Sequence, residues 1–187
     1  VKKRKPIPIV YIKNIQEECK QIDDEVRWLV SLISDTGMRL SEAVGLHIND
    51  INLDCDIAHI DLKPHAWRSL KTKSSTRQIP LVGASLWAAK RIKENNNGSL
   101  YVFPRYTSNK ETKSNSASAA INKWLKSRVP EGCVIHSFRH SLRDRLRAVN
   151  CPSDVIDQIG GWSIRSIGQG YGEGYSIKII FKWIDKI

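Results

Sequence analysis

The chain has 187 residues, of which 41% are hydrophobic and 26% charged, and its 30 Lys and Arg against 19 Asp and Glu give a net charge of +11. These values are ordinary for one globular domain, and no apolar run approaches the roughly 18 residues of a membrane-spanning helix. No long apolar segment follows the basic opening VKKRKPIPIVYIK, so we expect no signal peptide and a cytoplasmic protein. Neither a zinc site nor a disulfide framework is expected, because the cysteines are scattered: Cys19, Cys55, Cys133 and Cys151.

The first half of the chain predicts two helices and two strands. Residues 23–37 are predicted to form a helix ending at Gly37, with apolar residues at helical spacing: Val26, Leu29, Val30 and Ile33. The segment RLSEAVGL begins a second helix. Alternation of apolar and polar residues predicts a strand at 57–62, and residues 76–81 predict its partner after the turn-like KTKSS.

The second half is predicted to be helical. Helices are expected at 85–96, at 116–129, within 135–150, and after Pro152 with Ser153 or Asp154 as N-cap. The last helix, 176–186, has an apolar face suited to docking on this chain's core or a neighbour's: Ile177, Ile180, Phe181 and Ile184. The fold class is therefore α+β, predominantly α-helical with a small antiparallel β-sheet.

Positive charge gathers in two stretches. Residues 63–93 contain basic side chains and no acidic ones, and residues 105–128 contain basic side chains and Glu111 alone. Such one-signed stretches favour a polyanionic partner, because neutralising phosphates releases counterions.

Five motifs follow one another: TGMRLSEAVGL, KTKSSTRQIPL, HSFRH, GGWS and a tyrosine in a glycine-rich segment. Together they resemble the catalytic domain of tyrosine recombinases, the family of phage and mobile-element integrases, over about residues 25–187. The resemblance implies that residues 1–187 are a single catalytic domain, without the N-terminal DNA-binding domain usual in the family. It assigns the catalytic set to Arg39, Lys73, His136, Arg139, Trp162 and Tyr171.

Charge stabilisation is expected from Arg39 and Arg139, whose guanidinium forks match phosphate oxygens. Glu42 lies one helical turn after Arg39, close enough to share its face. By resemblance it orients the site, and a solvated helix carboxylate is the alternative. By resemblance, a lysine in the turn between two strands protonates the leaving 5′ oxygen. Lys73 fits this turn best, and Lys71 is the alternative.

His136 is expected either to take the proton of the tyrosine or to bind a non-bridging phosphate oxygen. His140 is expected to support the site, with packing as the equal alternative. Trp162 stands where most relatives carry histidine, and its indole N–H can donate a hydrogen bond but cannot transfer protons. Tyr171 follows Trp162 at the family's spacing and is the expected nucleophile, whereas Tyr175 has a similar setting at the wrong spacing.

The expected activity is site-specific breakage and rejoining of DNA through a 3′-phosphotyrosyl intermediate, without metal or other cofactor. The expected partner is double-stranded DNA, on which four copies assemble, whereas the free chain is monomeric or weakly associating. Direct DNA contacts are expected from Lys71, Arg77 and Arg143. Two alternatives remain open: a non-catalytic DNA-binding regulator, and a type IB topoisomerase or hairpin-forming enzyme with the same chemistry.

Overall fold

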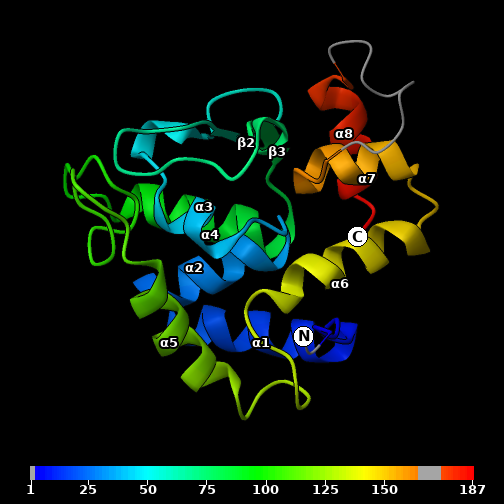
Figure 1. Ribbon diagram of the computed structural model, residues 1–187, viewed down its shortest axis with the longest axis horizontal. Coiled ribbons are helices and arrows are strands. Elements are labelled where there is room, and N and C mark those ends of the chain that lie inside the picture. The colour runs from blue at the N-terminus through cyan, green and yellow to red at the C-terminus, as the bar shows by residue number, and fades with distance from the viewer. Residues whose placement is uncertain (1–2, 164–173) are drawn as a thin grey trace.

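The computed structural model describes residues 3–163 and 174–187, and in these ranges eight α-helices accompany one small sheet (Figure 1). This arrangement confirms the predicted α+β class dominated by helices. The helices are α1 (Ile9–Ile22), α2 (Glu25–Ser34), α3 (Leu40–Val44), α4 (Gly83–Glu94), α5 (Ser114–Leu125), α6 (Ser137–Ala148), α7 (Ser153–Gly160) and α8 (Ile177–Ile184).

The sheet has three antiparallel strands in the order β1 (Ile51–Asn52), β2 (His59–Leu62) and β3 (Arg77–Pro80). Both long strands were predicted, a few residues longer than they are. In the register, Ile60 of β2 faces Ile51 and Ile79, so three buried isoleucines line one face of the sheet. Two 3₁₀ helices flank the strands: η1 (Ile48–Asp50) and η2 (Lys73–Ser75).

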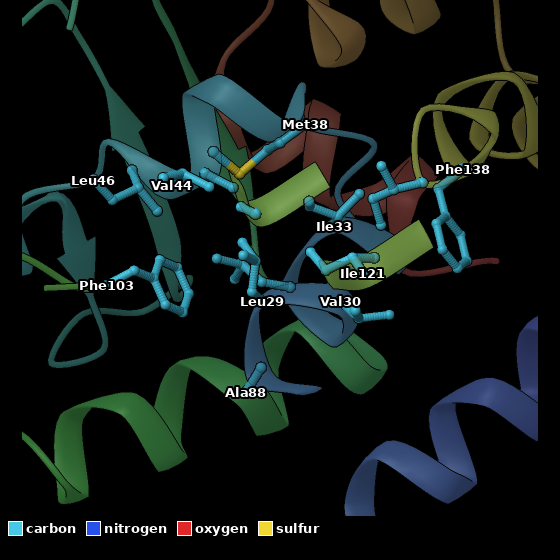
Figure 2. Packing of buried hydrophobic residues seen from close by; sticks show 14 of the residues in the cluster. Leu29, Val30, Ile33, Met38, Val44, Leu46, Ala88, Phe103, Ile121 and Phe138 are labelled. Atoms are coloured by element: carbon cyan, nitrogen blue, oxygen red, sulfur yellow. The ribbon is translucent and has the colours of Figure 1, made fainter. Parts of the chain in front are cut away.

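The main core is built around α2, as Figure 2 shows. Leu29, Val30 and Ile33 of α2 are fully buried because their spacing puts them on the faces that meet the neighbouring elements. They pack with Met38, Val44, Leu46, Ala88, Phe103, Ile121 and Phe138. Burial of each large side chain contributes about 1.5–3 kcal/mol, so this cluster fixes α3 and its neighbours in place.

A second apolar cluster joins α6, α7 and α8 (Figure 1). In α8, Ile180 and Ile184 are buried and Ile177 and Phe181 are half-buried, so the predicted apolar face is confirmed. This face packs on Val82, Leu142, Leu146, Val155, Ile156 and Ile159. The last helix therefore docks on the core of its own chain.

Three details of the prediction were wrong. Helix α1 was not predicted. Helix α2 ends at Ser34, three residues before Gly37, although Gly37 adopts a φ of 65° and donates its N–H to the carbonyl of Ile33. Helix α7 begins at Ser153 with Pro152 at the N-cap position, so neither Ser153 nor Asp154 is the N-cap.

The four cysteines all carry free thiols, and three of them are buried. Among the described residues, no helix is both long enough and apolar enough to cross a membrane.

Candidate active site

Arg39 and Glu42 form the first part of the site, at the N-terminus of α3. Arg39 occupies the N-cap position, and its Nη1 donates to Oε1 of Glu42 at 2.8 Å, while its backbone N–H donates to Oε2 at 3.0 Å. Glu42 is buried, with 2% of its surface exposed. The expectation of an orienting carboxylate is consistent with this geometry, whereas a solvated carboxylate is not.

Arg77 of β3 holds the other side of Glu42. Its Nη2 lies 3.0 Å from Oε2 of Glu42 and its Nη1 3.3 Å from Oε1. Burial alone would raise the pKa of Glu42, but the charge and hydrogen bonds of Arg77 and the hydrogen bonds of Arg39 outweigh it and lower that pKa. Only 3% of the Arg77 side chain is exposed, and its Nε, Nη1 and Nη2 all donate to protein oxygens, an arrangement that does not support the predicted contact of Arg77 with DNA.

The turn that carries Lys73 lies against Arg39. Nη1 of Arg39 donates to Oγ of the fully buried Ser75 at 3.3 Å, and Ser75 ends the 3₁₀ turn that begins at Lys73. Lys73 and Lys71 are both exposed. The hydrogen bond to Ser75 therefore holds this turn next to Arg39. Lys73 is part of the turn, whereas Lys71 lies two residues before it.

Arg139 of α6 lies deep in the protein. Its Nη1 donates to the carbonyl of Gly37 at 2.7 Å and its Nη2 to that of Gly160 at 2.9 Å, and 2% of the residue is exposed. Burial, together with the charge of Arg39, lowers the pKa of Arg139 to about 9. The guanidinium therefore remains charged at neutral pH. Its hydrogen bond to Gly37, two residues before Arg39, brings the two arginines into the same part of the fold.

His136 occupies the N-cap position of α6 and reaches the surface. The protein atoms on its inner side desolvate the ring, and with repulsion from Arg139 and His140 they lower the pKa of His136 to about 4. The ring is therefore neutral at neutral pH. His140 lies edge-on to it, with 5.7 Å between ring centroids.

The GGWS motif places Trp162 beside the arginines. Its ring lies 4.6 Å from Cζ of Arg139 and 4.0 Å from Cζ of Arg143, both cation–π distances. A Cβ on Gly160 would lie 1.7 Å from the indole ring, so the tryptophan folds back over this glycine. Gly161 has a φ of 65°, which favours glycine at this position.

The two candidate nucleophiles differ in what the structure describes. Tyr171 lies outside the described residues. Tyr175 is pinned to α7: its hydroxyl donates to Asp154, and its backbone N–H and carbonyl bond the side chain of Gln158 at 2.8 and 2.9 Å. The hydrogen bond to Asp154 raises the pKa of Tyr175, which makes this phenol a poorer nucleophile.

These residues form a cluster of positive charge around one buried carboxylate. Glu42 pairs with Arg39 and Arg77, while Arg139 bonds only backbone carbonyls within the described ranges. An anion such as a phosphodiester would offset the remaining charge. No group of three His, Cys, Asp or Glu side chains in the described part of the chain is arranged to hold a metal ion.

Residues 11–174 match the sequence profile of the phage integrase family. The chain belongs to this family. No curated protein sequence matches it significantly.

Solved structures of other integrases and recombinases share the fold. The Tn1549 transposon integrase in complex with circular intermediate DNA superposes with a TM-score of 0.67 at 17% identity, covering 95% of this chain and 64% of that one. The XerH site-specific recombinase in a post-cleavage complex with a palindromic difH substrate superposes with a TM-score of 0.63 at 18% identity, covering 86% and 47%. This phage integrase family chain thus spans less than two thirds of those proteins.

Sequence reasoning missed Ser75 and the buried state of Arg77 in this integrase-family chain. A signal was present for Arg77: residues two apart in a strand face the same side, and Ile79 of β3 is fully buried. For Ser75, a serine in a polar turn carries no sign of burial.

Proposed function

We propose that this chain breaks and rejoins DNA strands through a 3′-phosphotyrosyl intermediate, with Tyr171 as the nucleophile. The observation that carries the proposal is the convergence of Arg39 and Arg139, which lie far apart in the sequence: Arg139 bonds the carbonyl of Gly37, two residues before Arg39, in a cluster with excess positive charge. Membership in the phage integrase family supports it and does not favour a DNA-binding regulator, a topoisomerase or a hairpin-forming enzyme.

In the cleavage step, the phenolate oxygen of Tyr171 attacks the scissile phosphorus and the bond to the 5′ oxygen breaks. A phenol has a pKa of about 10, so the attack requires loss of its proton, which we assign to the neutral imidazole of His136. Lys73 donates a proton to the departing 5′ oxygen. A 5′ hydroxyl from another strand then attacks the phosphotyrosine and releases Tyr171.

The arginines stabilise the charge that develops on the phosphate. Both side-chain hydrogen bonds of Arg39 within the described ranges use Nη1, so we assign its Nε and Nη2 to the phosphate oxygens. Arg139 also has more N–H groups than its two carbonyl bonds use. Because these groups are already fixed by the fold, little reorganisation opposes the reaction. Trp162 adds one N–H donor.

The phosphotyrosine bond conserves the energy of the broken phosphodiester, so the reaction requires no nucleotide or metal. We therefore expect the covalent intermediate to form in the presence of EDTA.

The partner is double-stranded DNA, which Lys71 and Arg143 also contact, and the enzyme acts in the cytoplasm. The similar Tn1549 and XerH structures are DNA complexes, which supports a DNA partner. We propose that four protomers assemble on two duplexes and associate weakly without DNA. A tight tetramer of the free chain in equilibrium sedimentation would contradict this assembly.

The deciding experiment traps the intermediate. DNA fragments of the genome that encodes the chain are nicked lightly and incubated with the protein. Where a nick lies close to a cleavage site, the short strand with the 5′ hydroxyl diffuses away after cleavage, and the covalent intermediate cannot be rejoined. Denaturing electrophoresis should reveal a protein–DNA adduct that Tyr171→Phe abolishes and Tyr175→Phe preserves. If only Tyr175→Phe abolishes the adduct, Tyr175 and not Tyr171 is the nucleophile. If the wild-type chain forms no adduct, the proposed function is contradicted.

A further inference from the structure

We propose that Arg77 is a positioning residue, whose single buried guanidinium aligns three separate parts of the active site. The inference rests on the proposed function, because the three parts are the Arg39–Glu42 pair, the turn with Lys73 and the end of α7 before Trp162. No motif assigned Arg77 to the reaction itself.

The first contact is with the carboxylate that orients Arg39. Arg77 binds both oxygens of Glu42, at 3.0 and 3.3 Å, and Arg39 binds the same carboxylate at 2.8 Å. One carboxylate therefore lies between two guanidinium groups. Its position, and with it the direction of the Arg39 side chain, depends on Arg77.

The second contact is with the turn that carries Lys73. Nη1 of Arg77 donates to the carbonyl of Ser75 at 2.6 Å, while the hydroxyl of Ser75 accepts from Arg39 at 3.3 Å. The backbone of the turn and its one buried side chain are thus held by the two arginines. This restrains the path of the chain at Lys73, two residues earlier.

The third contact is with the C-terminal end of α7. Nε of Arg77 donates to the carbonyl of Ile159 at 2.8 Å, and Arg139 bonds the next carbonyl, Gly160. The last carbonyls of a helix lack intrahelical partners and carry partial negative charge, so two guanidinium groups suit this end. A Cβ on Gly161 would lie 2.6 Å from Nη1 of Arg77, so the glycine permits the close approach.

These contacts require the planar fork of arginine. Burial lowers the pKa of Arg77, and the charge of Glu42 offsets this only in part, so the buried cation is retained at a cost. A lysine could keep the charge but could not bind a carboxylate and two carbonyls in fixed directions at once. Arg77→Lys should therefore fold with a loosened site.

Arg145 of α6 offers a matched control. Its guanidinium also joins a carbonyl to a carboxylate, with 3.0 Å to Ser34 and 2.8 Å to Asp35, and its side chain is 11% exposed. It contacts none of the three parts described above. Arg145→Lys should lower stability as Arg77→Lys does, without changing the chemistry.

The test compares both variants with the wild-type chain in three measurements: the rate of adduct formation at saturating nicked genomic fragments, the affinity for those fragments, and the indole ¹H–¹⁵N resonance of Trp162. Arg77→Lys should slow adduct formation about 100-fold, as expected when catalytic groups move by about 1 Å, and should shift the Trp162 resonance. Its DNA affinity should stay within about threefold, because Arg77 is buried. Arg145→Lys should keep the wild-type rate and resonance.

The inference is overturned if Arg77→Lys keeps the wild-type rate, if its affinity falls as much as its rate, or if Arg145→Lys slows the reaction equally. Should Arg77→Lys fail to fold, Gly161→Ala, which crowds the guanidinium, must show the same slow rate and unchanged affinity. If the wild-type chain forms no adduct, the proposed function fails, and the Trp162 resonance alone decides the positioning: a shift in Arg77→Lys but not in Arg145→Lys supports it, and no shift overturns it.

Discussion

Arg77 and Glu42 form an ion pair that is almost completely buried, with side-chain exposures of 3% and 2%. Surface ion pairs contribute little to stability, but a buried pair behaves differently when one partner is removed, because the remaining charge stays desolvated. The pair therefore links the stability of the fold to the geometry of the site.

Replacement of Glu42 by glutamine should destabilise the protein strongly. The amide keeps the shape but leaves Arg77 without a counter-charge, and such losses cost about 3–5 kcal/mol. Urea unfolding followed by tryptophan fluorescence measures this free energy. Glu94→Gln is the control, because its pair with Arg91 is exposed and its loss should cost far less. A cost below 1 kcal/mol for Glu42→Gln would contradict the argument.

Gly160 and Trp162 should be coupled energetically. Gly160→Ala places a methyl group 1.7 Å from the indole ring and should cost about 1–3 kcal/mol through overpacking. In a Trp162→Ala background the same change should be neutral or stabilising, since alanine is favoured over glycine in a helix by roughly 0.5–1 kcal/mol. Unfolding of the two single variants and the double variant gives the coupling, and additive effects would show that the ring does not lie over Gly160.

The elements that sequence patterns predicted well are those with long apolar periodicity, such as α2 and α8. Strand β1 has two residues, too few for any alternation, and α1 buries Gln16 among its apolar residues, which weakens its pattern. In both cases tertiary contacts rather than local sequence determine the structure.

In the candidate site, too, some features follow from local sequence and others only from tertiary contacts. The motifs pointed to Arg39 and Arg139 without any knowledge of the fold, and in the structure Arg139 bonds the carbonyl of Gly37, two residues before Arg39. Arg77 was assigned to the DNA surface because its charge was visible in the sequence and its partner Glu42, far away in the chain, was not. The catalytic roles of Arg39, Lys73, His136, Arg139, Trp162 and Tyr171 all remain predictions.

A change of the leaving atom from oxygen to sulfur can show whether Lys73 or Lys71 is the general acid. Both side chains are exposed, so replacement by alanine should leave the fold intact. If Lys73 protonates the 5′ oxygen, Lys73→Ala should slow cleavage by about 10²–10⁴-fold, the usual contribution of a general acid. A substrate with sulfur in place of that oxygen should restore the rate, because a thiolate leaves without a proton.

Lys71→Ala should instead weaken DNA binding and leave the rate at saturating DNA unchanged, because a phosphate contact contributes to affinity. The opposite pattern, with sulfur rescuing Lys71→Ala only, would assign the acid to Lys71. Rescue of neither variant would show that neither lysine acts as the acid.

His136 should make the free protein less stable in mild acid. Its pKa in the folded chain is about 4, below the ordinary value of 6.5, because of desolvation and the nearby positive groups Arg139, His140, Arg39 and Arg4. Between these two values the unfolded chain binds a proton that the folded chain does not, so the free energy of unfolding falls as the pH falls through this window. The lowered pKa of His140 acts in the same direction.

Urea unfolding at about pH 7 and about pH 5 measures this dependence, in a range where the carboxylate of Glu42, whose pKa is lowered, stays ionised in the folded chain. His136→Asn should reduce the loss of stability between the two conditions, because asparagine does not titrate. His140→Asn measures the part of the pH dependence that comes from His140.

Bound DNA should also reduce the loss of stability in the wild-type chain, since a phosphate beside the ring offsets the arginine charges and raises the pKa of His136. An unchanged pH dependence in His136→Asn would show that the imidazole titrates normally in the folded protein, and that it is not held neutral for proton uptake from the tyrosine.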